Sequence, residues 1–560
     1  MNESYRSLFL VPLKNFLVTG QMGMYNERKG FGKQGDSQMG VYLNPTNDKF
    51  AIALNSSIYV DKTELIAYTN RVVATEQRYV CVSRPRRFGK SMAANMLTAY
   101  YSRGCDSREM FRGLKIFMNP GFEQYLNQYD VIMLNMQEFL SRTQNIEEML
   151  KRLKKMVVRD LKKEYPDVDY FDVEDIIQSM QDVYAETGRP FIIIIDEWDC
   201  VLRECTSEIE EQKKYLDFLR DFLKDKGYIH LVYMTGILPI KKYGTHSALN
   251  MFEEFSMTNP GPLAEYVGFT SDEVEQLCVQ YDMDYDEMKR WYDGYRLGDN
   301  LDIYSPRSVV SAILNRRFDN YWNQTETFEA LKIYIEMNYD GLKDTVIEMM
   351  AGARKQIDVR NFTNDMTTFH SYEDVLTLLI HLGYLGYEFE TKEAFIPNSE
   401  VADEYITAVK AAGWEEVIRT VQSSAALLRK TWDQNEDAVA EGIEKAHLET
   451  SHLQYNDENA LSYTIDLAYY SARQYYTIVR EMPTGKGFAD LVFLPRKKYS
   501  DKPAMIVELK WDKSIGGAIE QIKKNEYVSA LKDYQGNVLL VGVNYNKKSR
   551  QHECKIELWK

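Results

Sequence analysis

Three consecutive residues, Gly89, Lys90 and Ser91, have the types and the order that bind a phosphate group. They follow an apolar run, Tyr79–Ser83, and precede a stretch with helical spacing. The pattern GxxxxGK[ST] places such residues between a strand and a helix, where backbone amides surround phosphate oxygens. Lys90 is then expected to reach the terminal phosphates of ATP, and Ser91 to bind Mg²⁺. The first glycine of the pattern is replaced by Arg84, so the motif is incomplete at one end.

Two acids complete the expected nucleotide site. Asp196 and Glu197 end the apolar run Ile192–Ile195. We expect Asp196 to hold Mg²⁺ through water, and Glu197 to orient and deprotonate the attacking water. Arg86 and Arg87 of the loop add positive charge that suits phosphate oxygens. The alternative is a strand whose end carries solvated acids, but the upstream Gly-Lys-Ser triplet favours ATP binding.

Two further residues are weaker candidates. Thr235 ends the next apolar run. Thr235 would lie beside the γ-phosphate if its strand sits between two others, the strand before the phosphate loop and the strand ending in Asp196. The alternative is that Thr235 only caps a helix or loop. Arg307 opens a helical stretch and could reach back to the phosphates, or it is a surface arginine.

A second set of charged residues lies near the C-terminus. Asp490 is near the start of an expected strand, Gly487–Phe493, and Glu508 and Lys510 lie on the next one. Residues two apart in a strand share a face, so Glu508 and Lys510 point the same way and a hairpin can bring Asp490 beside them. Two carboxylates can hold Mg²⁺ while the lysine steadies a nucleophile or a phosphate. The alternative is a set of surface salt bridges on a hairpin.

The elements that position these residues indicate an α/β fold. From about residue 57, apolar runs alternate with helical stretches, which predicts a doubly wound parallel sheet. From about residue 270 the pattern is mostly helical. There a helix at Tyr372–Leu382 precedes a hairpin at 387–396, which resembles a winged helix. A helical lid with an incidental hairpin is the alternative. A C-terminal α/β unit follows, with a helix at Glu458–Tyr476, strands near Phe488–Phe493 and Met505–Leu509, a helix at Ala518–Leu531 and a strand at Val538–Val543.

These patterns predict five segments. They are a disordered arm or mis-assigned start (1–38), a phosphate-loop ATPase-like domain (39–268), a helical lid or winged-helix-like region (269–400), a helical connector (401–450) and a nuclease-like domain (451–560). The arm is expected because the stretch from Gly20 to Gln38 is rich in Gly and Gln, with no apolar period.

Composition limits the partners. The chain has 560 residues and a net charge of −16, so its surface as a whole should repel nucleic acid. Residues 485–560, however, carry 15 Lys and Arg against nine Asp and Glu. The basic groups there, Arg496–Lys498 and Lys547, Lys548 and Arg550, could contact phosphates or be solvated loops. Six cysteines without CxxC spacing and no long apolar stretch favour a cytoplasmic protein with no membrane contact.

The motifs together resemble a known combination. Tyr59–Thr63, the loop Arg84–Ser91, the strand end Ile194–Asp199 and the stretch Met234–Phe252 look like the bacterial AAA-ATPase-like family. That family often carries a C-terminal domain of the PD-(D/E)xK nuclease superfamily, and it tolerates the missing glycine. The resemblance implies roles for three accessory residues: Glu458 as an extra acid, and Gln521 and Tyr527 as a Q-x5-Y pair.

Two functions remain open at this point. In the first, ATP binding or hydrolysis controls a Mg²⁺-dependent nuclease whose partner is nucleic acid, which we expect to be DNA. In the second, the protein is an ATP-bound switch or scaffold whose C-terminal domain binds nucleic acid or a partner without cutting. The incomplete phosphate loop favours the switch, and the complete acid sets favour the enzyme. The sequence leaves the oligomeric state open.

Overall fold

The structure is a computed structural model that describes most of residues 40–559. The residues in this range that are not described are 207, 241–248, 299–300, 323–326, 338, 351, 363–368, 370, 450–457, 485–486 and 526–536. The predicted arm, 1–38, lies outside the described residues.

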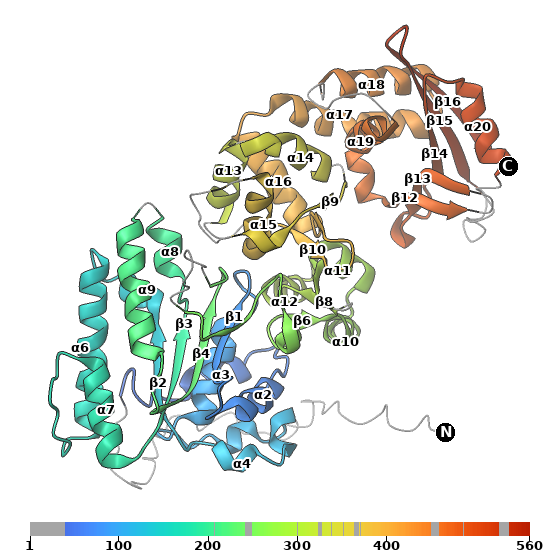
Figure 1. Cartoon of the computed structure of the whole chain (residues 1–560). Coiled ribbons are helices and arrows are strands. Elements are labelled where there is room, and N and C mark those ends of the chain that lie inside the picture. Colours follow the sequence, from blue (N-terminus) through green and yellow to red (C-terminus); the bar gives the residue numbers. More distant parts are fainter. Residues whose placement is uncertain are drawn as a thin grey trace. The chain divides into compact units, whose positions relative to one another are not determined.

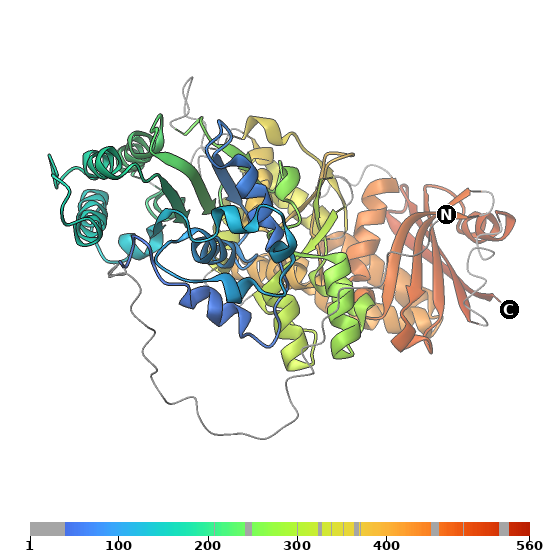
Figure 2. The same ribbon diagram turned by 90° about the horizontal axis from the view of Figure 1, so that it is seen from below.

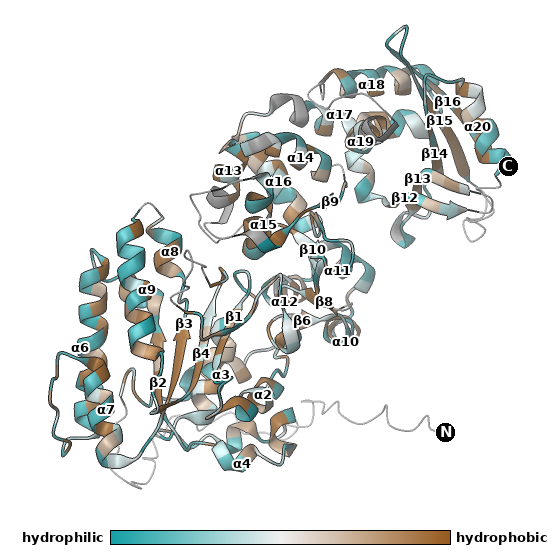
Figure 3. Ribbon diagram, viewed as in Figure 1, coloured by the Kyte–Doolittle hydropathy of each residue, from teal (hydrophilic) through white to brown (hydrophobic). Residues whose placement is uncertain are grey.

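The N-terminal region is built on a parallel sheet of five strands in the order β2-β3-β4-β1-β5. Its strands are Tyr79–Ser83 (β1), Asp130–Asn135 (β2), Phe191–Asp196 (β3), Ile229–Gly236 (β4) and Glu253–Phe255 (β5). Every residue of β1 and β3 is buried. Figure 3 shows the matching brown colour of β2 and β3. Burial on both faces explains why these strands are continuous apolar runs. The predicted parallel sheet is confirmed.

Helices connect these strands. They are Asp48–Leu54 (α1), Glu64–Val72 (α2), Lys90–Tyr101 (α3), Phe122–Tyr125 (α4), Met136–Leu140 (α5), Ile146–Glu164 (α6), Ile176–Thr187 (α7), Cys200–Glu204 (α8) and Ile209–Leu223 (α9). Figure 1 shows α6, α7 and α9 together on one side of the strands and α3 on the other. In α6, buried residues recur at helical spacing, and Asn145 caps the first turn by accepting a hydrogen bond from the amide of Glu148.

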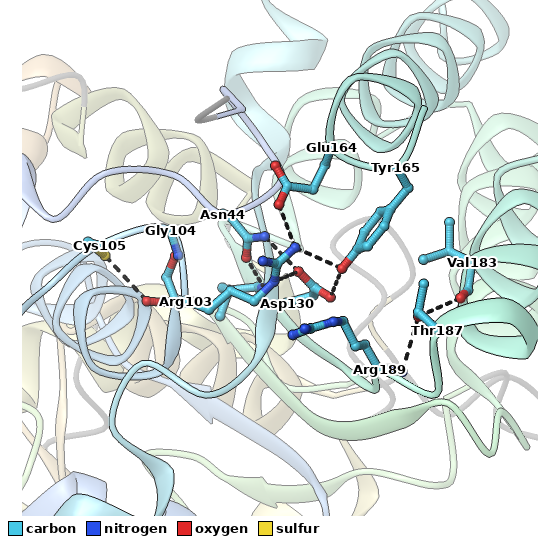
Figure 4. Close-up of polar contacts among 12 residues, drawn as sticks. Asn44, Arg103, Gly104, Cys105, Asp130, Glu164, Tyr165, Val183, Thr187 and Arg189 are labelled. Atoms are coloured by element: carbon cyan, nitrogen blue, oxygen red, sulfur yellow. Dashed lines mark hydrogen bonds and ion pairs between the residues drawn. The ribbon is translucent and has the colours of Figure 1, made fainter. Parts of the chain in front are cut away.

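A buried polar network surrounds the start of β2 (Figure 4). Asp130 accepts hydrogen bonds from Arg103 Nε at 2.5 Å and from Asn44 Nδ2 at 2.6 Å, and a third from the Tyr165 hydroxyl. Arg103 also donates to Glu164 at 2.5 Å. The network therefore ties the segment before α1 and the end of α6 to the edge of the sheet.

The first described residues are already bonded to the folded region. The amides of Val41 and Tyr42 both donate to Asp160 Oδ2 at 2.8 Å. Leu43, which is 1% exposed, forms a β-bridge with Ile132 of β2. The chain is thus held to the sheet edge from residue 41 onward.

The middle region contains two small sheets among helices. One sheet has the order β6-β8-β7 and the other β10-β11-β9. The strands are Phe269–Thr270 (β6), Tyr295–Leu297 (β7), Leu301–Tyr304 (β8), Lys355–Gln356 (β9), Gly386–Glu388 (β10) and Glu393–Phe395 (β11). The helices are Ser271–Tyr281 (α10), Tyr285–Tyr292 (α11), Pro306–Asn315 (α12), Thr327–Met337 (α13), Leu342–Met350 (α14), Tyr372–Leu382 (α15) and Ser399–Ala411 (α16). The predicted helix and hairpin are α15 and β10–β11, whereas the β6–β8 sheet was not predicted.

The C-terminal region is a mixed sheet in the order β12-β13-β14-β15-β16, in which only the β14–β15 pair is parallel. Its strands are Tyr476–Thr484 (β12), Gly487–Pro495 (β13), Ala504–Trp511 (β14), Val538–Asn546 (β15) and Gln551–Trp559 (β16). Figure 2 shows them side by side. The described helices here are Glu415–Trp432 (α17), Glu436–Glu449 (α18), Glu458–Ala468 (α19) and Ile515–Lys524 (α20).

Two aspects of this region differ from the sequence-based expectation. The helix expected over Glu458–Tyr476 ends at Ala468 and is followed by a 3₁₀ turn, Tyr470–Gln474, and then by β12. The helices predicted as a connector also share a core with the sheet, because Leu428 and Ile443 pack with its apolar residues. In the described part of the chain, no helix combines the length and apolar content that a membrane crossing requires.

Candidate functional site

The loop between β1 and α3 has the backbone of a phosphate-binding turn. Gly89 adopts a φ of 96°, in the left-handed region that glycine tolerates best. The other loop residue in this region is Arg87, with a φ of 70°; Arg84 is not left-handed. The amide of Arg84 instead donates to the carbonyl of Gly236 at 3.0 Å, and its guanidinium donates to the carbonyl of Phe255 at 2.9 Å. The loop therefore forms without a glycine at position 84.

Lys90 is held at the centre of this loop. Its ammonium donates to the carbonyls of Arg84 and Pro85, each at 2.9 Å, and the residue is 4% exposed. Burial lowers the pKa of Lys90, and nearby carboxylates, Glu197 foremost, oppose that shift. Ser91 lies exposed in the first turn of α3, which has no side-chain cap. The free amides of that turn and the ammonium thus offer donors to an anion.

Asp196 lies where three strands end. Thr235 Oγ1 of β4 donates to Asp196 Oδ1 at 2.5 Å, and Asn135 Nδ2 of β2 donates to Oδ2 at 3.3 Å. Asp196 is 2% exposed. The strand carrying Thr235, β4, lies between β1 and β3, the order on which the expectation for Thr235 depended. Asn135 was missed, because only the sheet register shows that it lies beside Asp196.

Glu197 is constrained by an arginine that the sequence analysis missed. Glu197 has a φ of 56°, which a residue with a Cβ rarely adopts. Arg203 donates to Glu197 Oε2 at 2.5 Å and to Asp199 Oδ2 at 3.1 Å. Burial raises the pKa of Glu197, while Lys90 and Arg203 lower it. Asp199 and Arg203 are four residues apart on one helix turn, a spacing that could have revealed the pair.

The remaining loop arginines differ in their surroundings. Arg87 donates to the carbonyl of Tyr321 at 2.7 Å and so contacts the middle region. Burial lowers the pKa of Arg87, as does the charge of Arg307, which therefore lies nearby. Arg307 itself is exposed in the first turn of α12, and Arg86 is half-buried. Arg307 is thus close enough to influence Arg87, and its reach to the phosphates stays a prediction.

The C-terminal candidates meet on neighbouring strands. Leu491 of β13 pairs with Val507 of β14, so Asp490 lies next to Glu508. Asp490 Oδ2 accepts a hydrogen bond from the amide of Leu509 at 2.7 Å. Lys510 Nζ donates to Glu508 Oε1 at 2.7 Å, and these two residues are 8% and 1% exposed. The structure therefore brings all three predicted residues together.

The accessory residues are placed less completely. Gln521 is half-buried on α20. Ile519 and Ile522 of this helix pack with Ile506, which lies on the same strand face as Glu508 and Lys510. Glu458 begins α19, which packs on the other face, and its side chain is outside the description. Tyr527 lies outside the described residues. Figure 1 shows α20 and α19 on opposite faces of the sheet.

Oxygen donors for a metal are present at both sites. No described group combines three or more His, Cys, Asp or Glu side chains in the geometry of a metal site. The pair Asp490 and Glu508 nevertheless offers the carboxylate oxygens that Mg²⁺ accepts together with water. Ser91 and Asp196 form the matching hydroxyl and carboxylate set at the phosphate loop.

Comparisons with known proteins match both regions. Residues 47–245 match a family model described as predicted AAA-ATPase, and residues 458–555 match one described as PD-(D/E)XK nuclease superfamily. No curated protein matches the chain. A solved structure with some similarity is the Aeropyrum pernix ORC2 protein, in ADPNP–ADP complexes. It is 12% identical, with a TM-score of 0.29, over 64% of this chain and 96% of that chain.

Proposed function

Because the chain joins an AAA-ATPase-like domain to a domain of the PD-(D/E)XK nuclease superfamily, we propose that ATP in the first controls metal-dependent cleavage of nucleic acid by the second. The observation that carries the proposal is the convergence of Lys90, Asp196 and Glu197. All three lie at the carboxyl end of one parallel sheet, which is where α/β proteins bind their ligands.

The phosphate loop supplies the binding groups. Lys90 would exchange the carbonyls of Arg84 and Pro85 for phosphate oxygens, and the amides of the first turn of α3 would donate to the same phosphates. Ser91, and Asp196 through water, would hold Mg²⁺, which would neutralise the charge that develops on the phosphates. Thr235 and Asn135 hold the Asp196 carboxylate in place by their hydrogen bonds.

Glu197 would act as the base for ATP hydrolysis. Its burial raises its pKa, and a carboxylate with a raised pKa accepts a proton from water more readily. Arg203 fixes one carboxylate oxygen, Oε2, and so orients the group. The proton taken from the attacking water would remain on the Glu197 carboxylate until product release.

The C-terminal domain would carry out the second reaction. Asp490 and Glu508 would hold a divalent cation, which would supply an activated water. Lys510 would leave Glu508 to hold the nucleophile or the phosphate. We expect DNA as the substrate, since residues 485–560 are basic within an acidic chain. The six free cysteines also suit the cytoplasmic location that we propose.

A switch without turnover is the second candidate. Its support is the pair of contacts that restrain the catalytic groups: Arg203 binds Glu197, and Glu508 binds Lys510. In that case ATP would be bound and retained, and the C-terminal domain would bind nucleic acid without cutting it.

ATP turnover with and without DNA separates the two candidates. The wild type should hydrolyse ATP, and Glu197→Gln should bind ATP without turnover, since it retains Lys90 and Asp196 but loses the base. Lys90→Ala should lose binding. Arg112→Ala, on an exposed ion pair with Glu109, is the matched control and should behave as wild type. Turnover that is equal in wild type and Glu197→Gln would contradict the assignment of the base.

A further inference from the structure

A cavity of about 670 Å³ lies away from both sites described above. Its walls come from α11, α16, the segment before β9, the 3₁₀ turn Tyr470–Gln474 and β12. Two aspartates and five arginines line it, in a chain whose net charge is −16. The arginines are Arg290, Arg354, Arg473, Arg480 and Arg496. We call this cavity the arginine groove. Its charge is opposite to that of the chain as a whole.

The arginines of the groove are incompletely satisfied. The Nε atoms of Arg290, Arg473 and Arg496 are buried, and none of them has a hydrogen-bond partner in the described part of the chain. Arg290 and Arg496 share one acid, Glu287, at 2.9 and 3.0 Å. Arg473 donates to the carbonyl of Met350 at 3.1 Å. Two guanidiniums thus share a single carboxylate, whereas Arg480 pairs with Asp466 and Arg354 lies 4.0 Å from Glu388. An anion in the groove would offset the positive charge that remains on Arg290, Arg473 and Arg496.

Burial of the groove arginines also favours binding of an anion. Burial lowers the pKa of Arg473, and burial followed by the charge of Arg290 lowers the pKa of Arg496. Burial is the largest cause of both shifts, since a charged guanidinium is less stable away from water. A bound phosphate would reverse both effects.

Aromatic side chains accompany the arginines. Trp291, Tyr470 and Phe395 line the groove, and a cation–π contact places Arg354 over the Phe395 ring at 4.1 Å. A second cavity of about 570 Å³ shares Arg290, Trp291 and Gln474 with the groove. The two cavities therefore adjoin at these three residues.

We propose that the arginine groove binds a single strand of nucleic acid, with phosphates on the arginines and bases stacked on Trp291 and Tyr470. The proposal rests on the nucleic-acid partner proposed above and specifies its form and path. A duplex keeps its base faces stacked inside, where the groove aromatics cannot reach them, whereas a single strand exposes them.

The test uses the full chain carrying Asp490→Ala, so that bound strands are not cut. A fluorescent oligothymidylate of about 16 nucleotides is titrated by anisotropy at several salt concentrations. Arg290→Gln and Arg473→Gln should each weaken binding about tenfold. Each should also reduce the slope of log affinity against log salt by about 0.7, the value for one lost phosphate contact on a single strand. Trp291→Ala should weaken binding about tenfold without changing that slope.

Controls separate binding from folding. Arg112→Gln removes an exposed arginine that pairs with Glu109 and should leave affinity and slope unchanged. Each variant should retain the wild-type melting temperature. If Arg473→Gln does not fold, Arg354→Gln reports on the groove instead, because the Arg354 side chain is 48% exposed and its loss disturbs packing less.

The outcomes distinguish the groove from the proposed enzyme. Unchanged affinity and salt slope in all groove variants would overturn the groove proposal, even if the wild type nicks plasmid in an Asp490-dependent manner. A duplex of the same length that binds as tightly as the single strand, with the same dependence on Arg290, would also overturn it. Groove-dependent binding of the oligonucleotide without any nicking would support the groove and count against the nuclease.

Discussion

Replacing Arg203 with methionine should destabilise the ATPase-like domain and change the titration of Glu197. Methionine keeps the length and the apolar stem of the side chain but removes the charge. Arg203 is the ion-pair partner of Glu197 at 2.5 Å and of Asp199 at 3.1 Å. Its side chain is 8% exposed and that of Asp199 0%, so solvent screens these contacts little.

The magnitude follows from leaving a buried carboxylate without its cation. Removing one partner of a buried ion pair costs about 3–5 kcal/mol. Asp199 keeps two backbone donors, the amides of Ile237 and Leu238 at 3.0 and 2.8 Å, which favours the lower end. For a domain of this size, about 3 kcal/mol corresponds to a melting temperature lower by roughly 6–12 °C.

The pH dependence has a definite sign. Burial raises the pKa of Glu197 above its ordinary value, and Arg203 opposes this, so the variant should have a still higher pKa. A carboxyl with a raised folded-state pKa destabilises the fold only when ionised. The stability difference between wild type and variant should therefore be largest at pH values above the raised pKa of Glu197, and it should shrink as the pH falls toward 4.5, the ordinary pKa. In the ATPase pH profile of the variant, the loss of activity at low pH should therefore begin at a higher pH than in the wild type.

The assay is thermal unfolding at several pH values, with Arg112→Met as the exposed control. The Arg112–Glu109 pair is about two-thirds exposed on both sides, so the control should change stability by less than about 1 kcal/mol. An Arg203→Met change as small as that of the control, at every pH, would refute the reasoning, because the contact would then be screened despite its burial.

Three further predictions concern separate parts of the chain. Asp130→Ala should cost about 3 kcal/mol in urea unfolding, the lower end for a broken buried ion pair, since the half-buried Arg103 loses that partner but keeps Glu164; a cost below about 1 kcal/mol would mean that water replaces the carboxylate. Lys90→Ala should abolish the rise in melting temperature that ATP and Mg²⁺ cause, and a normal ATP shift would show that ATP binds elsewhere. Deleting residues 1–38 should leave the melting temperature unchanged, because the described core contacts begin at Val41; a fall of several degrees would show that the arm supports the fold.

The sequence predicts the parallel sheet well because its strands are buried on both faces. Runs such as Phe191–Asp196 have no polar interruption, and they can be recognised without knowledge of their neighbours. The strands missed at the C-terminus are different. In β16, exposed and buried residues are mixed without strict alternation, since it lies at the sheet edge. Its pairing with β15 determines its structure more than its own pattern does.

The same contrast holds for the candidate sites, in which some residues belong to local sequence motifs and others meet only in the folded chain. Lys90, Asp196 and Glu197 stand in local motifs, and Glu508 and Lys510 share a strand face by spacing alone. Arg203 and Asn135 contact these residues through side chains, and the arginine groove combines residues from 290 to 496, so no local pattern predicts it. Such contacts become visible only when the fold brings distant segments together.

Plasmid nicking in Mg²⁺ and ATP tests the central claim most directly. Wild type is compared with Asp490→Ala and Lys510→Ala, and ATP binding is measured in parallel by thermal shift. The account predicts that wild type nicks the plasmid, that both variants do not, and that all three bind ATP equally, because the acids lie in a different domain from Lys90. Equal nicking by all three proteins, or no nicking by any of them, would contradict it.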